Sequence, residues 1–541
     1  MTNEVPERSP STETDALPAF VRALLAPAAY PHRPASVSLV QTHISYVFLA
    51  DELVYKAKKP VNFGFIDQVA FEARERHARQ EVVLNRRLAP DVYLDVVPII
   101  ERPDGSFTID VPPAKSDRVV EWAVKMRRLP DDRTLDRLIE ADAVPYGLPG
   151  RIAARLVAFH EAARVVENDP AFAGAEGERN WWAREYREAE GNIGGTWLAE
   201  DARDLREFVA AMLEREAALF DQRLAAGRVV EGHGDLHAKH IYTLGPRAED
   251  LVIVDCIEFT EWFHFRYLDV GYDLAFLAMD LEARGRRDLG DEVAGRYLAA
   301  TADETLGVLQ PLHRAFRAFV RGKVESIGAN ASEVPAAQRA ELAASAAAYF
   351  RLAAEFTRRR AQPALVVLSG PSGTGKSLIG ATLAARIGAA YVSSDAVRKQ
   401  LAGVPAHSHS NDAALYSPGM SDRTYAEVRR RAAEHLALRR AVVLDATHGR
   451  AVDRQAAREV ARDAGVPSLL VALSLTDDAA LARIEARQRD PLAISDATPE
   501  VYRRQVELFD PMSSSEGAHL SLDASQPLID LVEAIERALR G

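Results

Sequence analysis

Cysteine is almost absent from this 541-residue sequence, in which Cys256 is the only example. A single thiol cannot form an intramolecular disulfide, and no CxxC pair or Cys/His cluster indicates zinc. The N-terminus lacks the basic start and apolar core of a signal peptide, and no apolar run reaches the roughly 18 residues of a membrane span. These absences predict a cytoplasmic protein without a membrane segment.

An excess of basic residues is missing as well. The net charge is -12, and residues 362–541 contribute 21 Lys/Arg against 22 Asp/Glu, so the acidic excess lies in the first 361 residues. A non-specific nucleic-acid binder requires the opposite sign. The charge balance therefore favours a small-molecule partner over nucleic acid. No internal repeat of fixed period is found, and nothing in the pattern indicates an oligomeric state.

The chain is long enough for two or three domains. Residues 1–16, rich in Pro, Ser, Thr and Glu, are predicted to be disordered. Residues 17–130 form a strand-rich α+β segment, and residues 131–356 are mostly helical. The basic stretch 357–363 is a linker, and residues 364–541 alternate strand and helix, which is typical of a parallel α/β sheet. The predicted fold class is a multidomain protein of the α+β and α/β kinds.

Several elements are predicted within these segments. Two strands flank a turn at Ala50 to Glu52, and Val120, Trp122, Val124 and Met126 alternate on one face of another strand. A charged helix covers residues 71–88. The C-terminal segment contains four apolar strands and an amphipathic terminal helix, in ALVVLSG, AAYVSSD, AVVLDAT, SLLVALSL and PLIDLVEAIERALR.

The C-terminal segment carries a complete GxxxxGK[ST] motif between a strand and a helix. It comprises Gly370, Pro371, Ser372, Gly373, Thr374, Gly375, Lys376 and Ser377. Glycines allow backbone N–H groups to surround phosphates at the positive end of the helix, the lysine reaches the terminal phosphates, and the serine hydroxyl binds magnesium. The motif predicts an ATP site with Mg²⁺. The alternative is a glycine-rich turn that binds no nucleotide.

Two polar residues follow the second predicted strand of this segment. Asp395 ends that strand, at the carboxyl edge where open α/β sheets bind ligands. Its carboxylate is a candidate catalytic base for a substrate hydroxyl, and Arg398 is a candidate contact for the acceptor. An N-cap on the following helix is the alternative role for Asp395.

Asp445 ends the third strand and is a candidate magnesium ligand together with Ser377, with a turn or capping role as the alternative. Arg483 and Arg487 are four residues apart on one helical face. Such a pair suits a lid that closes on the phosphates, and we place Arg487 among the catalytic residues. A solvated helix surface is the alternative.

The segments GPSGTGKS, SSDAVRK, VVLDATH and the RxxxR pair together resemble the small P-loop kinases. That group includes gluconate kinases, polynucleotide kinase domains, chloramphenicol phosphotransferases and zeta toxins. The resemblance covers residues 362–541 and implies ATP-dependent phosphorylation of a hydroxyl group. It does not identify the acceptor.

A second motif, HGDLHAKH, occurs at residues 233–240, and Asp255 follows Asp235 by 20 residues. This arrangement resembles aminoglycoside phosphotransferase and choline kinase type enzymes, which share the protein-kinase-like fold. The resemblance implies that Asp235 positions or deprotonates the acceptor hydroxyl and that Asp255 binds magnesium. His237, in the same motif, is a candidate contact for the acceptor. It also implies a two-lobed fold for the N-terminal part.

Upstream residues complete the expected N-terminal site. Lys56 and Lys58 lie on the same face of a predicted strand, so either could reach ATP phosphates, and Glu81 is the expected carboxylate partner. The backbone around Met126 is expected to meet adenine. Surface charge is the alternative for each charged residue. With KKPVNFGF, NRRLAPDVYLDVVPI and the P-loop, the whole order resembles a bacterial family that fuses an aminoglycoside phosphotransferase-like domain to an AAA-type kinase domain.

His240 departs from that pattern, because such loops carry an asparagine metal ligand at this position. Magnesium prefers oxygen ligands, so an imidazole predicts weaker magnesium dependence, a shift towards Mn²⁺, or a slow site. The leading hypothesis is a phosphotransferase with two nucleotide sites that acts on a sugar, nucleoside or antibiotic-like hydroxyl. The alternatives are a P-loop kinase regulated by an N-terminal pseudokinase, and a polynucleotide 5′-hydroxyl kinase.

Overall fold

The computed structural model describes residues 17–64, 66–166, 173–260, 265–332, 334–408, 413–490, 492–513, 516 and 519–540. The predicted disordered segment, residues 1–16, lies outside these residues. The chain divides into two compact units, one made of Met1–Val144 with His233–Tyr267 and the other of Pro145–Gly232 with Leu268–Gly541. The domain boundaries predicted from the sequence stay predictions.

The first unit is built on a six-stranded antiparallel sheet with the order β1-β2-β3-β6-β4-β5. Its strands are β1 (Val37–Gln41), β2 (Ser45–Ala50), β3 (Leu53–Lys58), β4 (Tyr93–Glu101), β5 (Phe107–Ile109) and β6 (Arg118–Arg127). The predicted turn between β2 and β3 is confirmed, and Asp51 takes the left-handed conformation there, with φ of 53°. In this sheet β3 pairs with β6, and their register places Lys56 opposite Val124.

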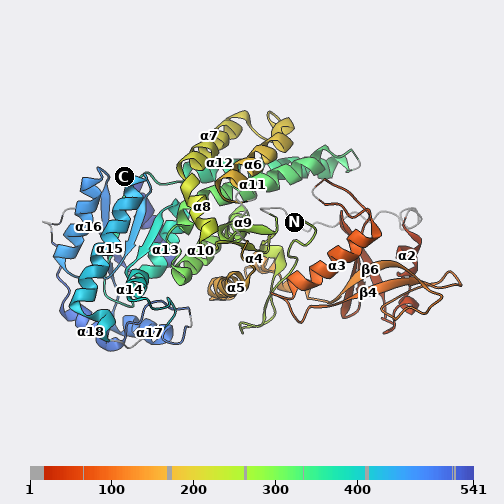
Figure 1. Ribbon diagram of the computed structural model, residues 1–541, viewed down its shortest axis with the longest axis horizontal. Coiled ribbons are helices and arrows are strands. Elements are labelled where there is room, and N and C mark those ends of the chain that lie inside the picture. Colours follow the sequence, from red (N-terminus) through yellow and green to blue (C-terminus); the bar gives the residue numbers. More distant parts are fainter. Residues whose placement is uncertain are drawn as a thin grey trace. The chain divides into compact units, whose positions relative to one another are not determined.

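Both faces of this sheet are covered. Helix α3 (Phe71–Asn85) packs Ala78 and Val82 against Val124 on one face, and α2 (Ala19–Ala23) lies with Phe48 and Tyr55 in the core of the other. Figure 1 shows α3 lying along β4 and β6. The short helix α4 (Leu135–Glu140) and the hairpin of β8 (Ile241–Thr243) and β9 (Leu251–Ile253) belong to the same unit.

The predicted alternation along β6 is wrong at its start. Val124 and Met126 share the α3 face, but Val120 packs against the core on the opposite face. The reason is a register shift in the β4–β6 pairing, where Ile99 pairs with Glu121 and Ile100 pairs with Val119. A β-bulge of this kind reverses the side-chain alternation, and sequence periodicity does not reveal it.

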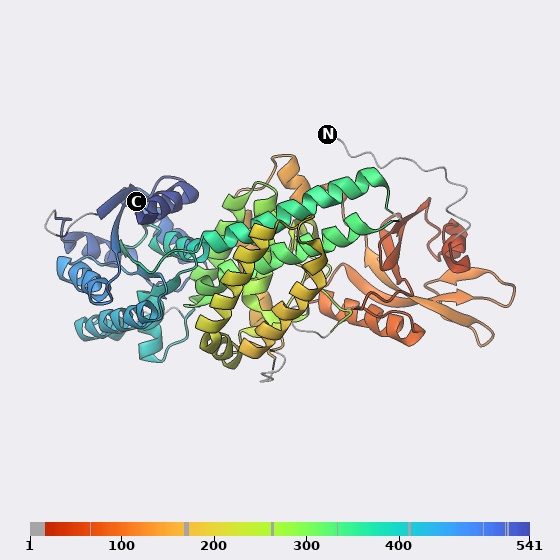
Figure 2. The ribbon, with the colours of Figure 1, turned by 90° about the horizontal axis from the view of Figure 1, so that it is seen from above.

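The second unit contains a helical layer, as the sequence predicts. Its helices are α5 (Leu148–Ala162), α6 (Gly174–Ala189), α7 (Ala199–Arg215), α8 (Ala217–Ala225), α9 (Val270–Ala283), α10 (Arg287–Thr301), α11 (Leu306–Asn330) and α12 (Ala336–Arg358). The strands β7 (Val229–Glu231) and β10 (Tyr267–Asp269) form a small additional sheet. The longest pair, α11 and α12, lies side by side in both views (Figures 1 and 2).

A parallel five-stranded sheet follows, with the order β12-β13-β11-β14-β15. Its strands are β11 (Leu365–Ser369), β12 (Ala390–Ser393), β13 (Val442–Asp445), β14 (Ser468–Ser474) and β15 (His519–Asp523). The helices are α13 (Lys376–Ile387), α14 (Ser394–Ala402), α15 (Pro418–Ala437), α16 (Ala451–Asp463), α17 (Asp477–Arg487), α18 (Pro499–Glu507) and α19 (Leu528–Arg540). The predicted α+β and α/β fold class is confirmed. The sequence analysis missed β15, because this edge strand alternates half-buried and exposed residues and lacks an apolar run.

The helical layer and the parallel-sheet part are packed closely within this unit. A Cβ added to Gly295 of α10 would lie 2.0 Å from Thr382 Oγ1 of α13, so only glycine permits this approach. Two polar contacts connect the same parts: in a buried ion pair Arg440 Nη2 lies 2.5 Å from Glu216 Oε2, and His435 Nε2 lies 2.6 Å from Glu304 Oε1. The P-loop helix α13 is therefore in direct contact with the helical layer at Thr382.

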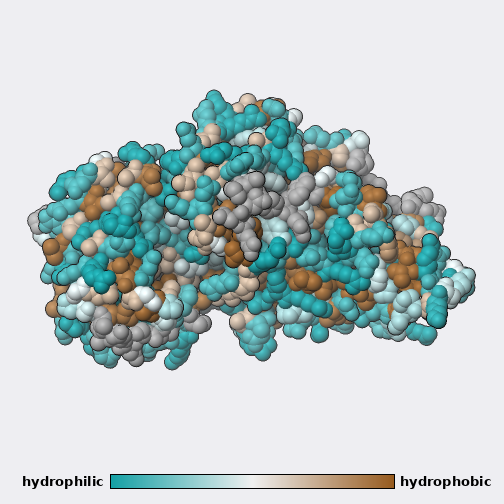
Figure 3. Space-filling model, viewed as in Figure 1, coloured by the Kyte–Doolittle hydropathy of each residue, from teal (hydrophilic) through white to brown (hydrophobic). Residues whose placement is uncertain are grey.

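Among the described residues, no helix combines the length and apolar character needed to cross a bilayer. Figure 3 shows hydrophilic and hydrophobic residues intermixed over the face in view.

Candidate phosphate-binding sites

The glycine-rich loop at residues 370–375 connects β11 to α13 at the carboxyl edge of the parallel sheet. Gly370, Gly373 and Gly375 have positive φ angles of 152°, 83° and 88°. A Cβ on Gly373 would lie 2.6 Å from the carbonyl oxygen of Ala480, so both conformation and space require glycine there. The loop therefore turns its backbone directly into the N-terminus of α13, where N–H groups favour an anion.

Lys376 is the first residue of α13 and is 8% exposed. Its Nζ donates to the carbonyl oxygen of Pro371 at 2.9 Å. Burial lowers the pKa of Lys376 to about 8, although the carboxylates of Asp445 and Asp395 oppose this change and Arg487 reinforces it. The tertiary structure thus brings Lys376 within electrostatic range of three of the residues that the sequence analysis selected.

Asp445 is the last residue of β13 and is buried beside the loop. Its Oδ2 accepts a hydrogen bond of 2.7 Å from the hydroxyl of Tyr391, which lies on β12. Burial raises the pKa of Asp445, although Lys376 and hydrogen bonds from Tyr391 and Ser377 act in the opposite direction. The pairing with Ser377 agrees with the predicted metal-binding role, which stays a prediction. Sequence patterns did not indicate Tyr391.

The sequence analysis expected Asp395 to end a strand, and this prediction is wrong. The strand β12 stops at Ser393, which is the N-cap position of α14, and Asp395 lies in the first turn of that helix. The N-cap alternative for Asp395 is therefore wrong as well. The side chain instead accepts a hydrogen bond of 3.0 Å from Arg398 Nη1, and the guanidinium of Arg398 lies 4.8 Å from the ring centre of Tyr416.

The two predicted lid arginines lie on α17. Arg483 donates to the carbonyl oxygen of Ala524 at 3.0 Å, and its Nη1 would lie 3.4 Å from a Cβ on Gly375. Arg487, the last residue of α17, donates to the carbonyl oxygen of Ala497 at 3.4 Å. One further contact was not expected: the backbone N–H of Ser372 donates to Gln505 Oε1 of α18 at 2.7 Å. A glutamine on a surface helix carries no sequence signal for such a contact.

The second site lies in the first unit, where HGDLHAKH forms a loop before β8. Gly234 has φ of 85°, and a Cβ there would lie 1.9 Å from the carbonyl oxygen of Phe265. The loop ends in a short 3₁₀ helix at Ala238–His240. Glycine thus permits the tight backbone path that presents Asp235 and the histidines that follow it.

Lys56 and Lys58 of β3 both bind Glu81 of α3. Lys56 Nζ lies 2.9 Å from Glu81 Oε1 and 2.9 Å from Asp255 Oδ1. Lys58 Nζ lies 2.6 Å from Glu81 Oε2 and also pairs with Glu258. The predicted lysine–glutamate pairing is present, but the two lysines differ: the Lys56 side chain is 15% exposed beside Asp255, whereas Lys58 is completely enclosed.

Glu258 was not identified from the sequence. It lies three residues after Asp255, and only the fold brings it to Lys58. Burial raises the pKa of Glu258 despite the attraction of Lys58. The pKa of Glu81 is lowered, because Lys56 and Lys58 outweigh the effect of its burial. Glu81 is therefore the carboxylate that both ammonium groups hold in the charged form.

His240 lies between the two predicted catalytic-site aspartates. Its Nδ1 donates to the backbone carbonyl oxygen of Asp235 at 2.9 Å, and its Nε2 lies 3.5 Å from Asp255 Oδ2. Since a carbonyl oxygen can only accept, Nδ1 carries a proton, and Nε2 is the ring nitrogen that faces the Asp255 carboxylate. When Nε2 is unprotonated, this arrangement suits a cation shared between Nε2 and the carboxylate.

Asp235 is surrounded by imidazoles. His237 Nε2 and His240 Nδ1 lie 3.5 and 3.7 Å from Asp235 Oδ2, and the rings of His237 and His240 lie 3.9 Å apart between centres. Burial favours a higher pKa, but His237, His240 and His233 outweigh it and hold the pKa of Asp235 well below its usual range. Asp235 is thus an ionised carboxylate and a weak proton acceptor.

Asp255 takes the left-handed conformation, with φ of 70°, and its N–H donates to the hydroxyl of Tyr93 at 3.2 Å. Lys56 and His240 overcome the effect of burial and hold the pKa of Asp255 well below its usual range. Its two oxygens therefore face different partners, Lys56 on one side and His240 on the other.

Met126 lies apart from this polar cluster. Its side chain packs with Val124 and Val254 in the apolar core beneath α3. The next two backbone N–H groups, of Arg127 and Arg128, donate to the carbonyl oxygens of Val92 and Glu52. The contact between this segment and adenine stays a prediction.

Comparisons with known proteins agree with the C-terminal geometry. A family model described as an AAA domain matches residues 365–512. Together with the parallel sheet and the loop before Lys376, this match defines a P-loop nucleotide-binding domain and confirms the expected C-terminal class.

The uncharacterized protein Rv2004c of Mycobacterium tuberculosis strain H37Rv is 31% identical over 471 residues, which cover 86% of this chain and 88% of that protein. The uncharacterized protein Mb2027c of Mycobacterium bovis matches with the same identity and coverage. The chain belongs to the family that these mycobacterial proteins represent.

Solved structures are similar to parts of this chain. A choline/ethanolamine kinase family protein from Mesorhizobium loti is 16% identical, with 61% of this chain and 96% of that chain covered and a TM-score of 0.36. A gluconokinase from Sinorhizobium meliloti is 22% identical, with 34% of this chain and 94% of that chain covered and a TM-score of 0.26.

Proposed function

We propose that this protein is an ATP-dependent phosphotransferase with two nucleotide sites that phosphorylates hydroxyl groups of small molecules. The observation that carries the proposal is the position of Lys376. It begins the P-loop helix at the carboxyl edge of the sheet, and the carboxylates of Asp445 and Asp395 both act on its charge. A cation, a metal-binding carboxylate and a candidate base in one place are the parts that phosphoryl transfer requires.

The residues at the C-terminal site fit ATP and a divalent ion. ATP, when bound, supplies the phosphoryl group for transfer. The glycine-rich loop and Lys376 would hold its phosphates, and Ser377 with Asp445 would hold Mg²⁺. Because the Lys376 ammonium is buried, its charge is poorly compensated without an anion, which favours phosphate binding.

Asp395 is the proposed base at this site. Its ion pair with Arg398 orients the carboxylate, and the guanidinium of Arg398 in turn lies over the ring of Tyr416. The base would accept the proton of the acceptor hydroxyl as the oxygen attacks, while Arg398 would bind a polar or anionic group of the acceptor. Arg483 and Arg487 would stabilise charge on the transferring group from the lid helix.

The N-terminal site would act by the same chemistry with different ligands. Lys56, held by Glu81, is the proposed phosphate contact, and Asp255 with His240 Nε2 would hold the metal ion. Asp235 would orient the acceptor hydroxyl and take its proton late in the reaction, since its low pKa makes it a weak base. His237 lies beside Asp235 and would contact the acceptor.

A regulatory N-terminal domain is the second candidate. The observation that favours it is His240, which replaces an oxygen ligand with nitrogen opposite Asp255. A site with slow or no transfer could still bind nucleotide through Lys56 and Glu81. In that case the first unit would regulate the P-loop domain without chemistry.

The two candidates are separated by testing each site alone. Sugars, nucleosides and antibiotics would be screened with ATP for a mass gain of one phosphate, using wild type, Lys376→Ala and Asp235→Asn. We expect each variant to lose a different product. Lys115→Ala, a change of an exposed lysine, is the matched control. Retention of every product in Asp235→Asn would support the regulatory role, and retention in Lys376→Ala would refute the C-terminal assignment.

A further inference from the structure

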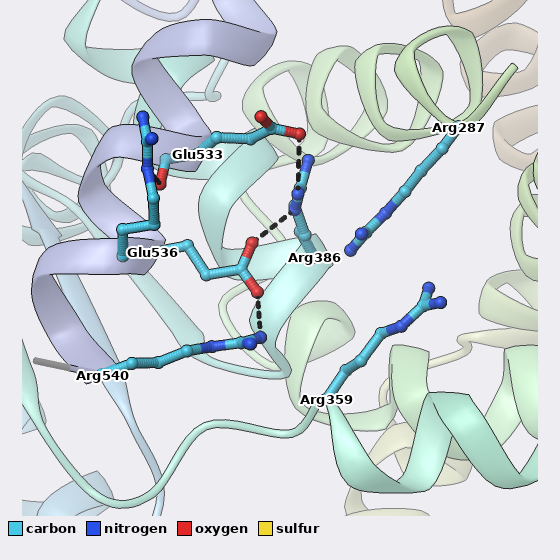
Figure 4. Close-up of a pocket in the computed structure, with 7 residues that line it drawn as sticks. Arg287, Arg359, Arg386, Glu533, Glu536 and Arg540 are labelled. Atoms are coloured by element: carbon cyan, nitrogen blue, oxygen red, sulfur yellow. Dashed lines mark hydrogen bonds and ion pairs between the residues drawn. The ribbon is translucent and has the colours of Figure 1, made fainter.

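An arginine-lined hollow of about 260 Å³ in the second unit shares no lining residue with either phosphate-binding site. Figure 4 shows its lining side chains, with Arg287 pointing towards Arg386. They come from four distant parts of the sequence: the start of α10, the end of α12, the last turn of α13 and the terminal helix α19. The lining residues are Arg287, Arg359, Arg386, Glu533, Glu536, Arg537 and Arg540.

Carboxylates neutralise part of this charge. Glu536 accepts from Arg386 at 2.8 Å and also pairs with Arg540, and Glu533 lies 3.2 Å from Arg386. Carboxylates that do not line the hollow pair with the same arginines. Asp291 pairs with Arg386, and Arg359 pairs with Glu282 and, at 2.6 Å, with Glu355. These pairs position the guanidinium groups, but they leave Arg287 Nε without a hydrogen-bond partner among the described residues.

The unused donors belong chiefly to two arginines. Arg287 Nε is buried without a hydrogen-bond partner among the described residues, and the nearest carboxylate oxygen, of Asp291, lies 3.4 Å away. Arg314 lines an adjoining smaller hollow together with Arg287, Arg359 and Arg386. Its side chain is 4% exposed, and its Nε and Nη2 also lack partners in the described part of the chain.

Unsatisfied buried donors are costly, so they indicate a missing acceptor. The electrostatics agree: burial, with the neighbouring charges of Arg386 and Arg359, lowers the pKa of Arg287 despite two nearby carboxylates. Positive charge therefore remains in excess at this point. Guanidinium groups bind phosphate through paired N–H donors, and several converging arginines suit a ligand with more than one phosphoryl group.

We propose that this hollow binds a small polyphosphorylated molecule at a site separate from the nucleotide sites. At about 1.5 Å per residue of helix, Arg386 lies roughly 15 Å along α13 from Lys376. The ligand would contact α10, α13 and α19 together. It would therefore stabilise the attachment of the P-loop domain to the helical layer.

Inorganic tripolyphosphate is a suitable probe, and its binding to the other two sites must be removed first. Lys56→Ala and Lys376→Ala would be combined in the full-length chain, and binding measured by titration calorimetry. Arg287→Gln and Arg537→Gln would then be added separately. Arg430→Gln, on the exposed face of α15, is the matched control because Arg430 pairs only with its own helix among the described residues.

We expect one binding site in the double variant, at least about tenfold weaker binding after Arg287→Gln, and unchanged binding after Arg430→Gln. Arg537→Gln should weaken binding as well, and this exposed side chain is a safe substitution if Arg287→Gln lowers the unfolding temperature. The proposal is overturned if millimolar tripolyphosphate gives no binding heat, or if affinity is the same with and without the Arg287 and Arg537 changes.

Discussion

His240 Nε2 faces Asp255 Oδ2 at a distance of 3.5 Å, and the hydrogen bond from Nδ1 to the Asp235 carbonyl fixes which ring nitrogen is turned that way. When Nε2 is unprotonated, a bridging cation would fit between Nε2 and this carboxylate oxygen. A nitrogen and an oxygen ligand together favour manganese more than an all-oxygen set does. A histidine in place of the asparagine of such loops is thus compatible with metal binding, with a preference shifted from magnesium towards manganese.

The first prediction concerns this pair. His240→Asn should raise activity with Mg²⁺ relative to Mn²⁺ at the N-terminal site by about tenfold, because an amide oxygen replaces the imidazole nitrogen. The measurement is product formation against the concentration of each metal in a Lys376→Ala background. His43→Asn, in the loop between β1 and β2, is a control for the loss of an imidazole. An unchanged metal ratio would exclude His240 as a ligand.

The second prediction separates the two lysines of β3. Lys58→Met should cost about 3–5 kcal/mol of unfolding free energy, because it leaves Glu81 and Glu258 as buried carboxylates without their common partner. Lys56→Met should cost less stability and should instead weaken nucleotide binding at the N-terminal site. Chemical denaturation and nucleotide titration of both variants would check this. Equal stability of the two variants would contradict the structural role of Lys58.

The third prediction is a pH dependence. Burial lowers the pKa of Lys376 to about 8, so the free protein loses this charge as pH rises through 8. In a Lys56→Ala background, ATP affinity should fall above pH 8, and Lys376→Arg should flatten this part of the profile since arginine stays charged. Without nucleotide the stability effect has the opposite sign: between pH 8 and the unfolded value of 10.5 the unfolded chain binds more protons, so the free energy of unfolding rises as pH rises.

The fourth prediction concerns Asp395. Asp395→Asn should lower kcat at the C-terminal site by about 10²–10⁴-fold with little change in ATP affinity, because the amide cannot accept the hydroxyl proton. Single-turnover kinetics with the acceptor found in the screen would measure it. Asp422→Asn, an exposed change on α15, is the control. If kcat survives in Asp395→Asn, the carboxylate serves mainly to hold Arg398.

Local sequence was sufficient for the P-loop. Its glycines, Lys376 and Ser377 are consecutive, and the strand and helix around them follow from contiguous patterns, so no long-range information was needed. The same holds for the pairing of β2 with β3 across a short turn. Local sequence was not sufficient for Asp395, because β12 ends at Ser393 and α14 already begins at Ser394, which places the carboxylate in a helix. It was not sufficient for β6 either, where a bulge reversed the alternation.

Long-range packing determined the partners of the polar residues. Glu258 reaches Lys58 across 200 positions of the chain, and the orientation of His240 depends on a carbonyl that points towards its ring. The arginine hollow gathers four separate segments. Motifs show only which residue types lie near each other along the chain. The distances that decide which ion pairs form, and which buried donors stay without a partner, arise only when the units fold.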